Sequence, residues 1–271
     1  MTVLRQRVIT GVVGVPLVIL AIWFGDPWFS LLIAAAALAS TYEFYRLYDF
    51  DNRGPLLYVG LILVLGLALG PHYQERSPDV LAAVITATVL ISLIWLLGLS
   101  SKDKAFSKWA WAIAGAFYIG WMLSYWLSLR GLEDGRNWVC LAMLTTFAND
   151  TGAYFIGRAW GRHRLAPMIS PSKTWEGVIG GLVSAILGAM VIAAVLNPIS
   201  PFSFRYWQII VLGFLVGLFA QLGDLVESLL KRNMRVKESG SLLPGHGGVL
   251  DRFDSLIFVG AVIYYYLIWV V

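Results

Sequence analysis

The stretch DVLAAVITATVLISLIWLLGL (79–99) carries a single charged residue, Asp79, at its first position. A bilayer core about 30 Å thick is crossed by roughly 20 apolar residues in a helix. This stretch is long and apolar enough to do so. We therefore predict that it is a membrane-spanning helix.

Eight further runs share this character. They cover about 8–25, 28–47, 55–70, 109–129, 138–157, 175–196, 207–230 and 255–271. Of the 271 residues, 59% are hydrophobic and only 13% are charged, whereas a soluble domain has about 25% charged residues. The sequence predicts an all-α polytopic membrane protein with about nine transmembrane helices. The first run is too long for the apolar core of a signal peptide, so we expect it to be retained.

The positive charges predict the orientation. With the N-terminus inside, 16 of the 20 Lys and Arg residues fall on the cytoplasmic side, as the positive-inside rule requires. We expect a cytoplasmic N-terminus, an outside C-terminus and a location in a bacterial cytoplasmic (inner) membrane. The single cysteine, Cys140, excludes a disulfide framework and a cysteine-based metal site.

Polar chemistry concentrates in the second half. Residues 1–140 are expected to supply about five scaffold helices that face the lipid. Residues 141–271 are expected to be the catalytic region, with two cytoplasmic loops at 158–174 and 231–254. Asp150 lies at membrane depth, where an acid is costly and by default functional; the alternative is a packing residue bonded on its own helix.

The segment SPSKTWEG (170–177) opens the seventh run. Ser170 as N-cap and Pro171 at the first helical position form a helix start signal. With Ser172, Lys173 and Thr174 nearby, the free N–H groups would cradle a phosphate. A capped helix with a lysine that reaches the interface explains the segment equally well.

The segment AQLGDLVESLLKR (220–232) places acids beside cations. Asp224, Glu227, Ser228 and Lys231 share one helical face, and Arg232 follows. Such a face is either a structural ion-pair network or a set of metal ligands beside a bound phosphate.

The segment LLPGHGGVLDRFDS (242–255) combines a glycine turn with charged residues. Gly247 and Gly248 let the backbone approach an anion closely, and His246 is placed to bond a phosphate or a ribose. Asp251 and Asp254 follow on the next helix. Oxygen ligands for a hard cation, basic residues and a phosphate cradle together indicate phosphoryl or nucleotidyl transfer onto a lipid.

The segment SLLKRNMRVKESGSLLPGHGGVLDRFDS (228–255) closely resembles the signature of phosphatidate cytidylyltransferases, also called CDP-diacylglycerol synthases. The resemblance extends to SPSKTWEG, NDTGAYFIG and QLGD, and so covers about residues 145–256. Glu238 departs from the pattern, which has aspartate there, and is left out of the site.

The resemblance implies that phosphatidate attacks the α-phosphorus of CTP, giving CDP-diacylglycerol and pyrophosphate. It implies magnesium as cofactor, with a second cation as an option, membrane lipids as surroundings, no nucleic acid partner and a homodimer. The candidate catalytic residues are Asp224, Asp251, Lys173 and His246. The candidate substrate-binding residues are Ser170, Ser172, Thr174, Lys231, Arg232, Gly247, Gly248 and Arg252. The candidate metal ligands are Asp224, Asp251 and Asp254.

Four alternatives stay open beside this interpretation. The protein could be a transporter whose intramembrane acids relay ions, although its acids sit at one end of their helices rather than at the midplane. It could transfer a phospho-alcohol from CDP-diacylglycerol, although that family's four spaced aspartates are absent. It could be a cytidylyltransferase for another lipid phosphate, such as an isoprenoid phosphate, or a non-catalytic relative that binds lipid.

Overall fold

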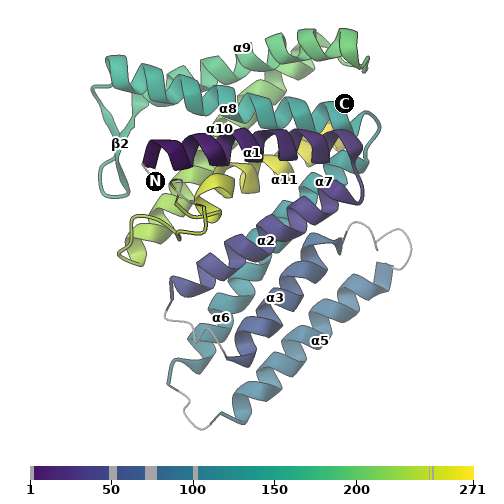
Figure 1. Ribbon diagram of the computed structural model, residues 1–271, viewed down its shortest axis with the longest axis vertical. Coiled ribbons are helices and arrows are strands. Elements are labelled where there is room, and N and C mark those ends of the chain that lie inside the picture. Colours follow the sequence, from purple (N-terminus) through teal and green to yellow (C-terminus); the bar gives the residue numbers. More distant parts are fainter. Residues whose placement is uncertain (1–2, 49–53, 71–77, 100–102, 244, 246) are drawn as a thin grey trace. The chain divides into compact units, whose positions relative to one another are not determined.

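The computed structural model describes residues 3–48, 54–70, 78–99, 103–243, 245 and 247–271. Over these residues the protein is helical, with one small sheet (Figure 1). The helices are α1 (Val3–Phe24), α2 (Trp28–Arg46), α3 (Pro55–Ala68), α5 (Pro78–Leu97), α6 (Ala105–Gly115), the π-helix η1 (Ala116–Trp121), α7 (Met122–Gly131), α8 (Gly135–Trp160), α9 (Trp175–Ile199), α10 (Tyr206–Asn233) and α11 (Leu250–Val270). The strands are β1 (Arg164–Ala166) and β2 (Ser170–Thr174), paired antiparallel.

Each predicted apolar run coincides with a helical segment of the described chain. Five of these segments are long and apolar enough to cross a membrane, namely Asp79–Leu97, Ala105–Gly131, Trp175–Ile199, Tyr206–Asn233 and Leu250–Val270. This agrees with the predicted all-α membrane class. The number of nine spans and the orientation of the termini stay predictions.

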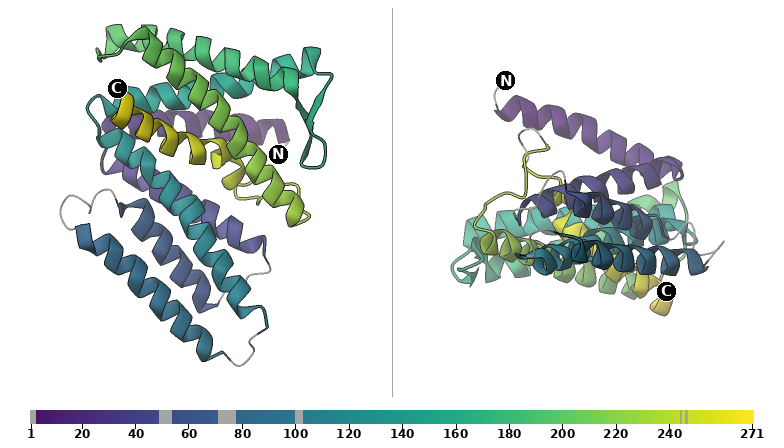
Figure 2. Two further views of the ribbon diagram at one scale, coloured as in Figure 1. Left: turned by 180° about the vertical axis from the view of Figure 1, so that it is seen from behind. Right: turned by 90° about the horizontal axis from the view of Figure 1, so that it is seen from below.

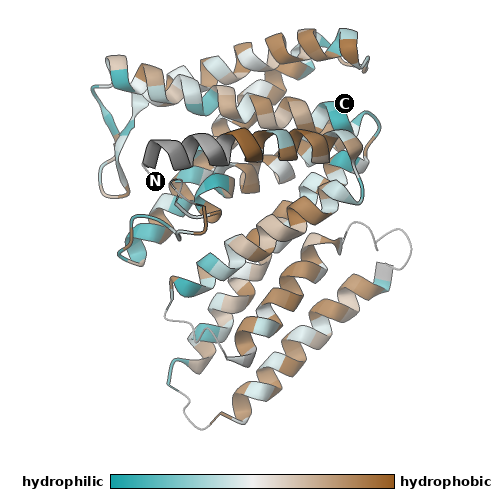
Figure 3. Ribbon diagram, viewed as in Figure 1, coloured by the Kyte–Doolittle hydropathy of each residue, from teal (hydrophilic) through white to brown (hydrophobic). Residues whose placement is uncertain are grey.

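Apolar side chains on the outside of the helices support a lipid environment. Most of the apolar residues of α5 and α9 are exposed, and Figure 3 shows α5 as hydrophobic along most of its length. Apolar faces of this extent are unfavourable in water, whereas lipid tails cover them without cost. In a bilayer, helices also satisfy their own backbone hydrogen bonds.

The described residues form two compact units. Unit 1 consists of residues 1–127 and 237–253, and unit 2 of residues 128–236 and 254–271. This division by contacts differs from the predicted division of roles at residue 140, which stays a prediction. Helix α11 begins in unit 1 and continues in unit 2.

Unit 1 packs aromatic residues of α2 against α6. Phe44 stacks on Trp111 with ring centroids 4.5 Å apart, and the Trp111 indole donates to the Phe44 carbonyl oxygen at 3.1 Å. The hydroxyl of the fully buried Tyr45 donates to the carbonyl oxygen of Ala112 at 2.7 Å. Helix α3 packs against α2, η1 and α5, and it lies beside α5 in Figure 1. Gly120 of η1 leaves room for the α3 backbone, since a Cβ there would lie 2.9 Å from the Val64 oxygen.

Unit 2 is built on α8, α9 and α10. Figures 1 and 2 both show α8 and α9 side by side, with α10 packed across them. Small residues allow this close approach, which is common between membrane helices. A Cβ on Gly177 would lie 3.0 Å from the Ala153 carbonyl oxygen, and one on Gly213 would lie 2.7 Å from the Ile186 backbone.

The segment between α8 and α9 differs from its prediction. Ser170 does not cap a helix and Pro171 is not its first residue, because Ser170–Thr174 is strand β2. Helix α9 begins at Trp175, with Thr174 as N-cap and its hydroxyl accepting from the Gly177 N–H at 3.2 Å. Pro171 fits a two-stranded hairpin because an edge strand needs no N–H at every position.

Candidate active site

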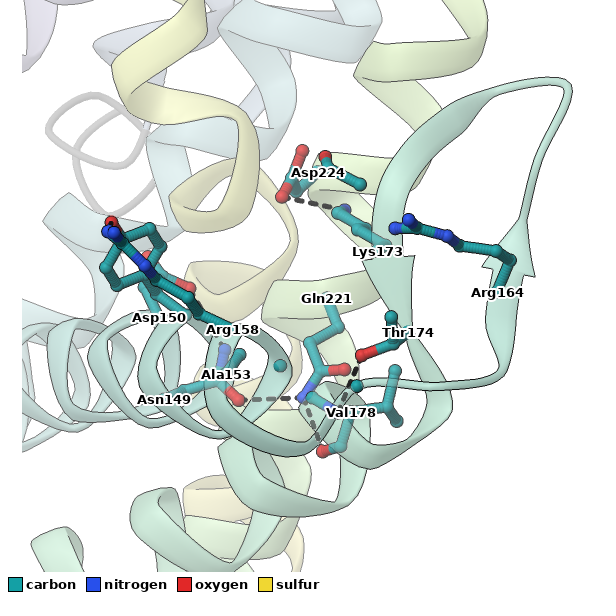
Figure 4. A pocket seen from close by; sticks show the side chains of 15 residues that line it. Asn149, Asp150, Ala153, Arg158, Arg164, Lys173, Thr174, Val178, Gln221 and Asp224 are labelled. Carbon is teal, nitrogen blue, oxygen red and sulfur yellow. Dashed lines mark hydrogen bonds and ion pairs between the residues drawn. The ribbon is translucent and has the colours of Figure 1, made fainter.

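A cavity of about 590 Å³ opens in unit 2 between α8, β2, α9 and α10 (Figure 4). Its volume falls within the range of small-molecule sites. It is lined by Asn149, Asp150, Ala153, Tyr154, Gly157, Arg158, Gly161, Arg164, Ser172, Lys173, Thr174, Gly177, Val178, Gln221 and Asp224. Acids and cations from four elements therefore share one hollow.

An ion pair joins β2 to α10 at the cavity wall. The Nζ atom of Lys173 lies 2.7 Å from Oδ2 of Asp224, and their side chains are 22% and 38% exposed. The Nζ atom of Lys173 is itself buried, whereas the Asp224 side chain is 38% exposed, so a ligand that enters the cavity has to displace Asp224 to reach Lys173. The wall offers a cation to a phosphate and a carboxylate to a metal ion.

Two arginines add positive charge to the same cavity. Asp150, Tyr154 and Arg158 follow one another at four-residue intervals on one face of α8, and the Arg158 guanidinium donates to the Tyr154 hydroxyl at 2.7 Å. Arg164 on β1 extends toward Lys173 on the neighbouring strand (Figure 4). Three cations in one hollow favour an anionic ligand.

The floor of the cavity is a hydrogen-bond network between three helices. Gln221 of α10 donates to Oδ1 of Asn149 at 2.9 Å and to the Val178 carbonyl oxygen at 3.1 Å. Asn149 is fully buried and donates in turn to Asp150 at 3.0 Å. A Cβ on Gly181 would lie 2.7 Å from the Asn149 oxygen, so glycine is required for this network. The bonding alternative for Asp150 therefore holds in part, although Asp150 also lines the cavity.

The hairpin that carries Lys173 is held at both ends. At its base, the Glu176 carboxylate accepts from the N–H groups of Arg162 and His163 and lies 2.6 Å from the His163 ring. At its tip, the Arg232 guanidinium donates to the Ile169 carbonyl oxygen at 3.1 Å. These contacts fix a short strand pair that its backbone bonds alone would leave marginal.

The acidic face of α10 contains a second ion pair. The Nζ atom of Lys231 lies 2.7 Å from Oε2 of Glu227, which is fully buried, and the Ser228 hydroxyl donates to Asp224 at 3.4 Å. A structural ion pair accounts for Glu227 and Lys231, whereas Asp224 faces the cavity. Asp254, on α11 in unit 2, lies within electrostatic range of Asp224.

The glycine-rich loop belongs to unit 1. Oδ2 of Asp251 accepts from the N–H groups of Ser239 at 3.0 Å and of Gly248 at 2.9 Å. Gly247 has a φ of +81°, a region that favours glycine, and its carbonyl oxygen accepts from the Leu243 N–H at 3.1 Å. His246 lies outside the described residues.

Comparisons with known proteins show the family of the chain. The profile of the "Cytidylyltransferase family" matches residues 5–270. The chain is 32% identical to a phosphatidate cytidylyltransferase of Bacillus subtilis (strain 168), over 97% of each chain. It is 37% identical to a phosphatidate cytidylyltransferase of Staphylococcus aureus (strain COL), over 74% of this chain and 75% of the relative. The chain belongs to the phosphatidate cytidylyltransferase family.

The structure brings together only some of the residues that the family signature indicates. Lys173, Ser172, Thr174 and Asp224 line the cavity, with the Thr174 hydroxyl occupied as a helix cap. Ser170, Lys231 and Arg232 are not part of the lining. Asp251, Arg252, Gly247 and Gly248 belong to unit 1, so their joint action with Asp224 stays a prediction.

Magnesium binding by this phosphatidate cytidylyltransferase family member also stays a prediction. Within the described residues, no group of three or more His, Cys, Asp or Glu side chains lies close enough to hold a metal ion. Magnesium is commonly bound through one or two carboxylates, waters and substrate phosphates. A lone accessible carboxylate such as Asp224 fits that pattern once phosphates are present.

Sequence reasoning missed Arg158 and Arg164 as cavity residues. Arg158 carried a usable signal, because it lies two four-residue steps beyond the membrane acid Asp150 on the same helical face. Arg164 carried none, because its place beside Lys173 depends on the pairing of β1 with β2.

Proposed function

We propose that this protein transfers a cytidylyl group from CTP to phosphatidate, giving CDP-diacylglycerol and pyrophosphate. The observation that carries the proposal is the Lys173–Asp224 ion pair on the wall of a cavity that Arg158 and Arg164 also line. The relatives of the same family bear the name of this reaction. We place the site at the cytoplasmic membrane face, where water-soluble CTP meets a lipid phosphate, because the Lys and Arg residues concentrate in the segments assigned to that side.

In the reaction, an oxygen of the phosphatidate phosphate forms a bond to the α-phosphorus of CTP. The bond from that phosphorus to the bridging oxygen of the β-phosphate breaks, and pyrophosphate leaves with the electron pair. A phosphate monoester is largely ionised near neutral pH, so no protein base is needed. Catalysis then depends on positioning and on stabilising charge.

The cavity residues have separate tasks. Lys173, Arg158 and Arg164 bind phosphate oxygens and hold the nucleophile and leaving group in line. For this, Lys173 exchanges Asp224 for a phosphate, and Asp224 becomes available to a cation. Magnesium, held by Asp224 and the predicted ligands Asp251 and Asp254, would neutralise charge that develops on the phosphates.

A direct assay tests the proposal. Purified protein in detergent micelles is incubated with phosphatidate, CTP labelled at the α-phosphate and magnesium, and then extracted with organic solvent. We expect label in the lipid phase that depends on both substrates and on the metal. Label transferred only to an isoprenoid phosphate offered in parallel would assign another lipid substrate, and no label from folded protein would contradict the proposal.

A further inference from the structure

A buried carboxylate on α2 contacts the glycine-rich loop from nearly 200 residues away in the sequence. Glu43 is 2% exposed. Its Oε2 atom accepts from the Ser239 hydroxyl at 3.1 Å and from the Leu250 N–H at 2.9 Å. All three residues belong to unit 1. Glu43 therefore binds the loop at its beginning and at its end.

Two glycines of the loop make room for this carboxylate. A Cβ on Gly240 would overlap Oε1 of Glu43, and a Cβ on Gly248 would lie 2.5 Å from Oε2. Neither glycine has a positive φ, unlike Gly247. Gly240 therefore requires space for Glu43, Gly248 requires space for both the Ser239 hydroxyl and Glu43, and neither has an unusual backbone conformation.

The cost of burying Glu43 indicates a role beyond packing. A carboxylate that leaves water for a buried site loses several kcal/mol of solvation unless hydrogen bonds replace it. An aliphatic side chain at this position would avoid that cost. An acid inside a predicted membrane helix is by default a functional residue.

Glu43 and Asp251 both accept hydrogen bonds from the same residue, Ser239. Glu43 accepts from the hydroxyl of Ser239, and Asp251 accepts from its backbone N–H at 3.0 Å. Asp251 also accepts from Gly248, the residue that leaves space for Glu43. A displacement of Ser239 would thus reach the Asp251 carboxylate directly.

We propose that Glu43 is a positioning residue that holds the 239–250 loop, and through Ser239 the Asp251 carboxylate, in the geometry needed for transfer. This role in turnover rests on the proposed function, whereas the anchoring of the loop does not. Residues that orient a metal ligand from behind typically change activity or metal affinity by about 10–100-fold when replaced.

The anchoring is tested by hydrogen exchange on the full protein in micelles. In Glu43→Ala, the amides of 239–250 should exchange at least about 10-fold faster than in the wild type, because local opening becomes easier. In Glu43→Gln they should stay protected, since the amide oxygen still accepts both bonds. Unchanged exchange in Glu43→Ala would overturn the proposal.

The role in turnover is tested by kinetics on the same variants. Glu43→Ala should lower kcat by about 10-fold or more and move the magnesium midpoint to higher concentration. Glu43→Gln should restore most of both, and the exposed Glu133→Ala should match the wild type. A wild-type kcat and magnesium midpoint in folded Glu43→Ala would contradict the positioning role.

Two milder variants keep the test decisive if Glu43→Ala does not fold. Ser239→Ala removes one donor to Glu43 and should loosen the loop partly. Gly240→Ala should loosen it by collision with Glu43. A loop unaffected in both Ser239→Ala and Gly240→Ala would overturn the proposal. If wild-type protein forms no labelled lipid, the proposed reaction fails while hydrogen exchange still decides the anchoring.

Discussion

Asp224 of unit 2 and Glu43 of unit 1 are carboxylates held in opposite ways. In unit 2, the partly exposed Asp224 side chain pairs with Lys173 on the wall of a cavity. In unit 1, Glu43 is buried and bonded to the backbone and side chains of a loop. A carboxylate on a cavity wall can exchange partners during a reaction, whereas a buried anchor holds its geometry. The first arrangement suits contact with substrate and the second suits positioning.

Among the variants that test this comparison, Asp224→Asn is expected to have the largest effect. If Asp224 acts directly on substrate or metal, turnover should fall by about 10²–10³-fold. Stability should also fall, because the change leaves the buried Nζ atom of Lys173 without the charge of its partner. The measurement combines lipid labelling with the midpoint of thermal unfolding in micelles, and the exposed Asp103→Asn is the control. Full activity would remove Asp224 from the site.

Gly181→Leu should disrupt the hydrogen-bond network of Asn149 and Gln221 at the floor of the cavity. A side chain at this position collides with Asn149 and Gln221, whose polar atoms would lie 2.7 and 2.8 Å from the new Cβ. Overpacking of this kind costs about 1–3 kcal/mol, visible as a lower unfolding midpoint. The matched control is Gly14→Leu, where a Cβ has nothing within 4 Å. Equal unfolding midpoints for the two variants would show that Asn149 and Gln221 can move aside without loss of stability.

Gln221→Leu tests whether the floor needs its hydrogen bonds as well as its space. The change leaves the buried Asn149 oxygen without the Gln221 donor, at a cost of about 1–3 kcal/mol. Replacing both partners, as Asn149→Leu with Gln221→Leu, should recover part of that stability because the Asn149 oxygen is no longer left without a donor, although Asp150 then loses the bond from Asn149. An equal or larger loss in the double variant would argue against the pair as a unit.

Tyr45→Phe should have the smallest effect of the four. It removes one bond, to the Ala112 carbonyl oxygen in unit 1, and should cost about 1 kcal/mol. Turnover should be unchanged because Tyr45 lies in the packing between α2 and α6. The exposed Tyr58→Phe serves as control for the loss of a hydroxyl, and a drop in kcat for Tyr45→Phe alone would extend the positioning role beyond Glu43.

The helices were predictable because the physics of a bilayer leaves few choices. A run such as 79–99 has few polar side chains to favour another structure, and it is indeed helical as α5. The signature residues Lys173 and Asp224 were also predictable, because a lysine beside a helix start and an acid near a helix end both point to phosphate and metal chemistry. In the structure they form an ion pair, and their roles with phosphate and metal stay predictions.

The start of α9 was predicted wrongly because two residues competed as N-cap. Ser170 and Thr174 are both residue types that favour the N-cap position. Thr174 is the N-cap in the structure, because its hydroxyl accepts from the Gly177 N–H and Glu176 anchors the base of the hairpin. Strand pairing between 164–166 and 170–174 depends on contacts that a local pattern does not contain.

Glu43 was missed although the sequence contained a signal. It is an acid inside the apolar run 28–47, and the rule that drew attention to Asp150 applies to it equally. Its partners, however, lie at Ser239 and Leu250, and no spacing within α2 points to them.

The glycine contact between α8 and α9 has a consequence for biogenesis. The two helices are neighbours in the chain, joined by a short hairpin, so their contact closes only a small loop and can form quickly. During synthesis the pair can assemble as soon as α9 is inserted, before α10 has been made. Helix α10 is made later. With Gln221 and Asp224 it would then complete the cavity, whose other lining residues on α8, the hairpin and α9 are already assembled.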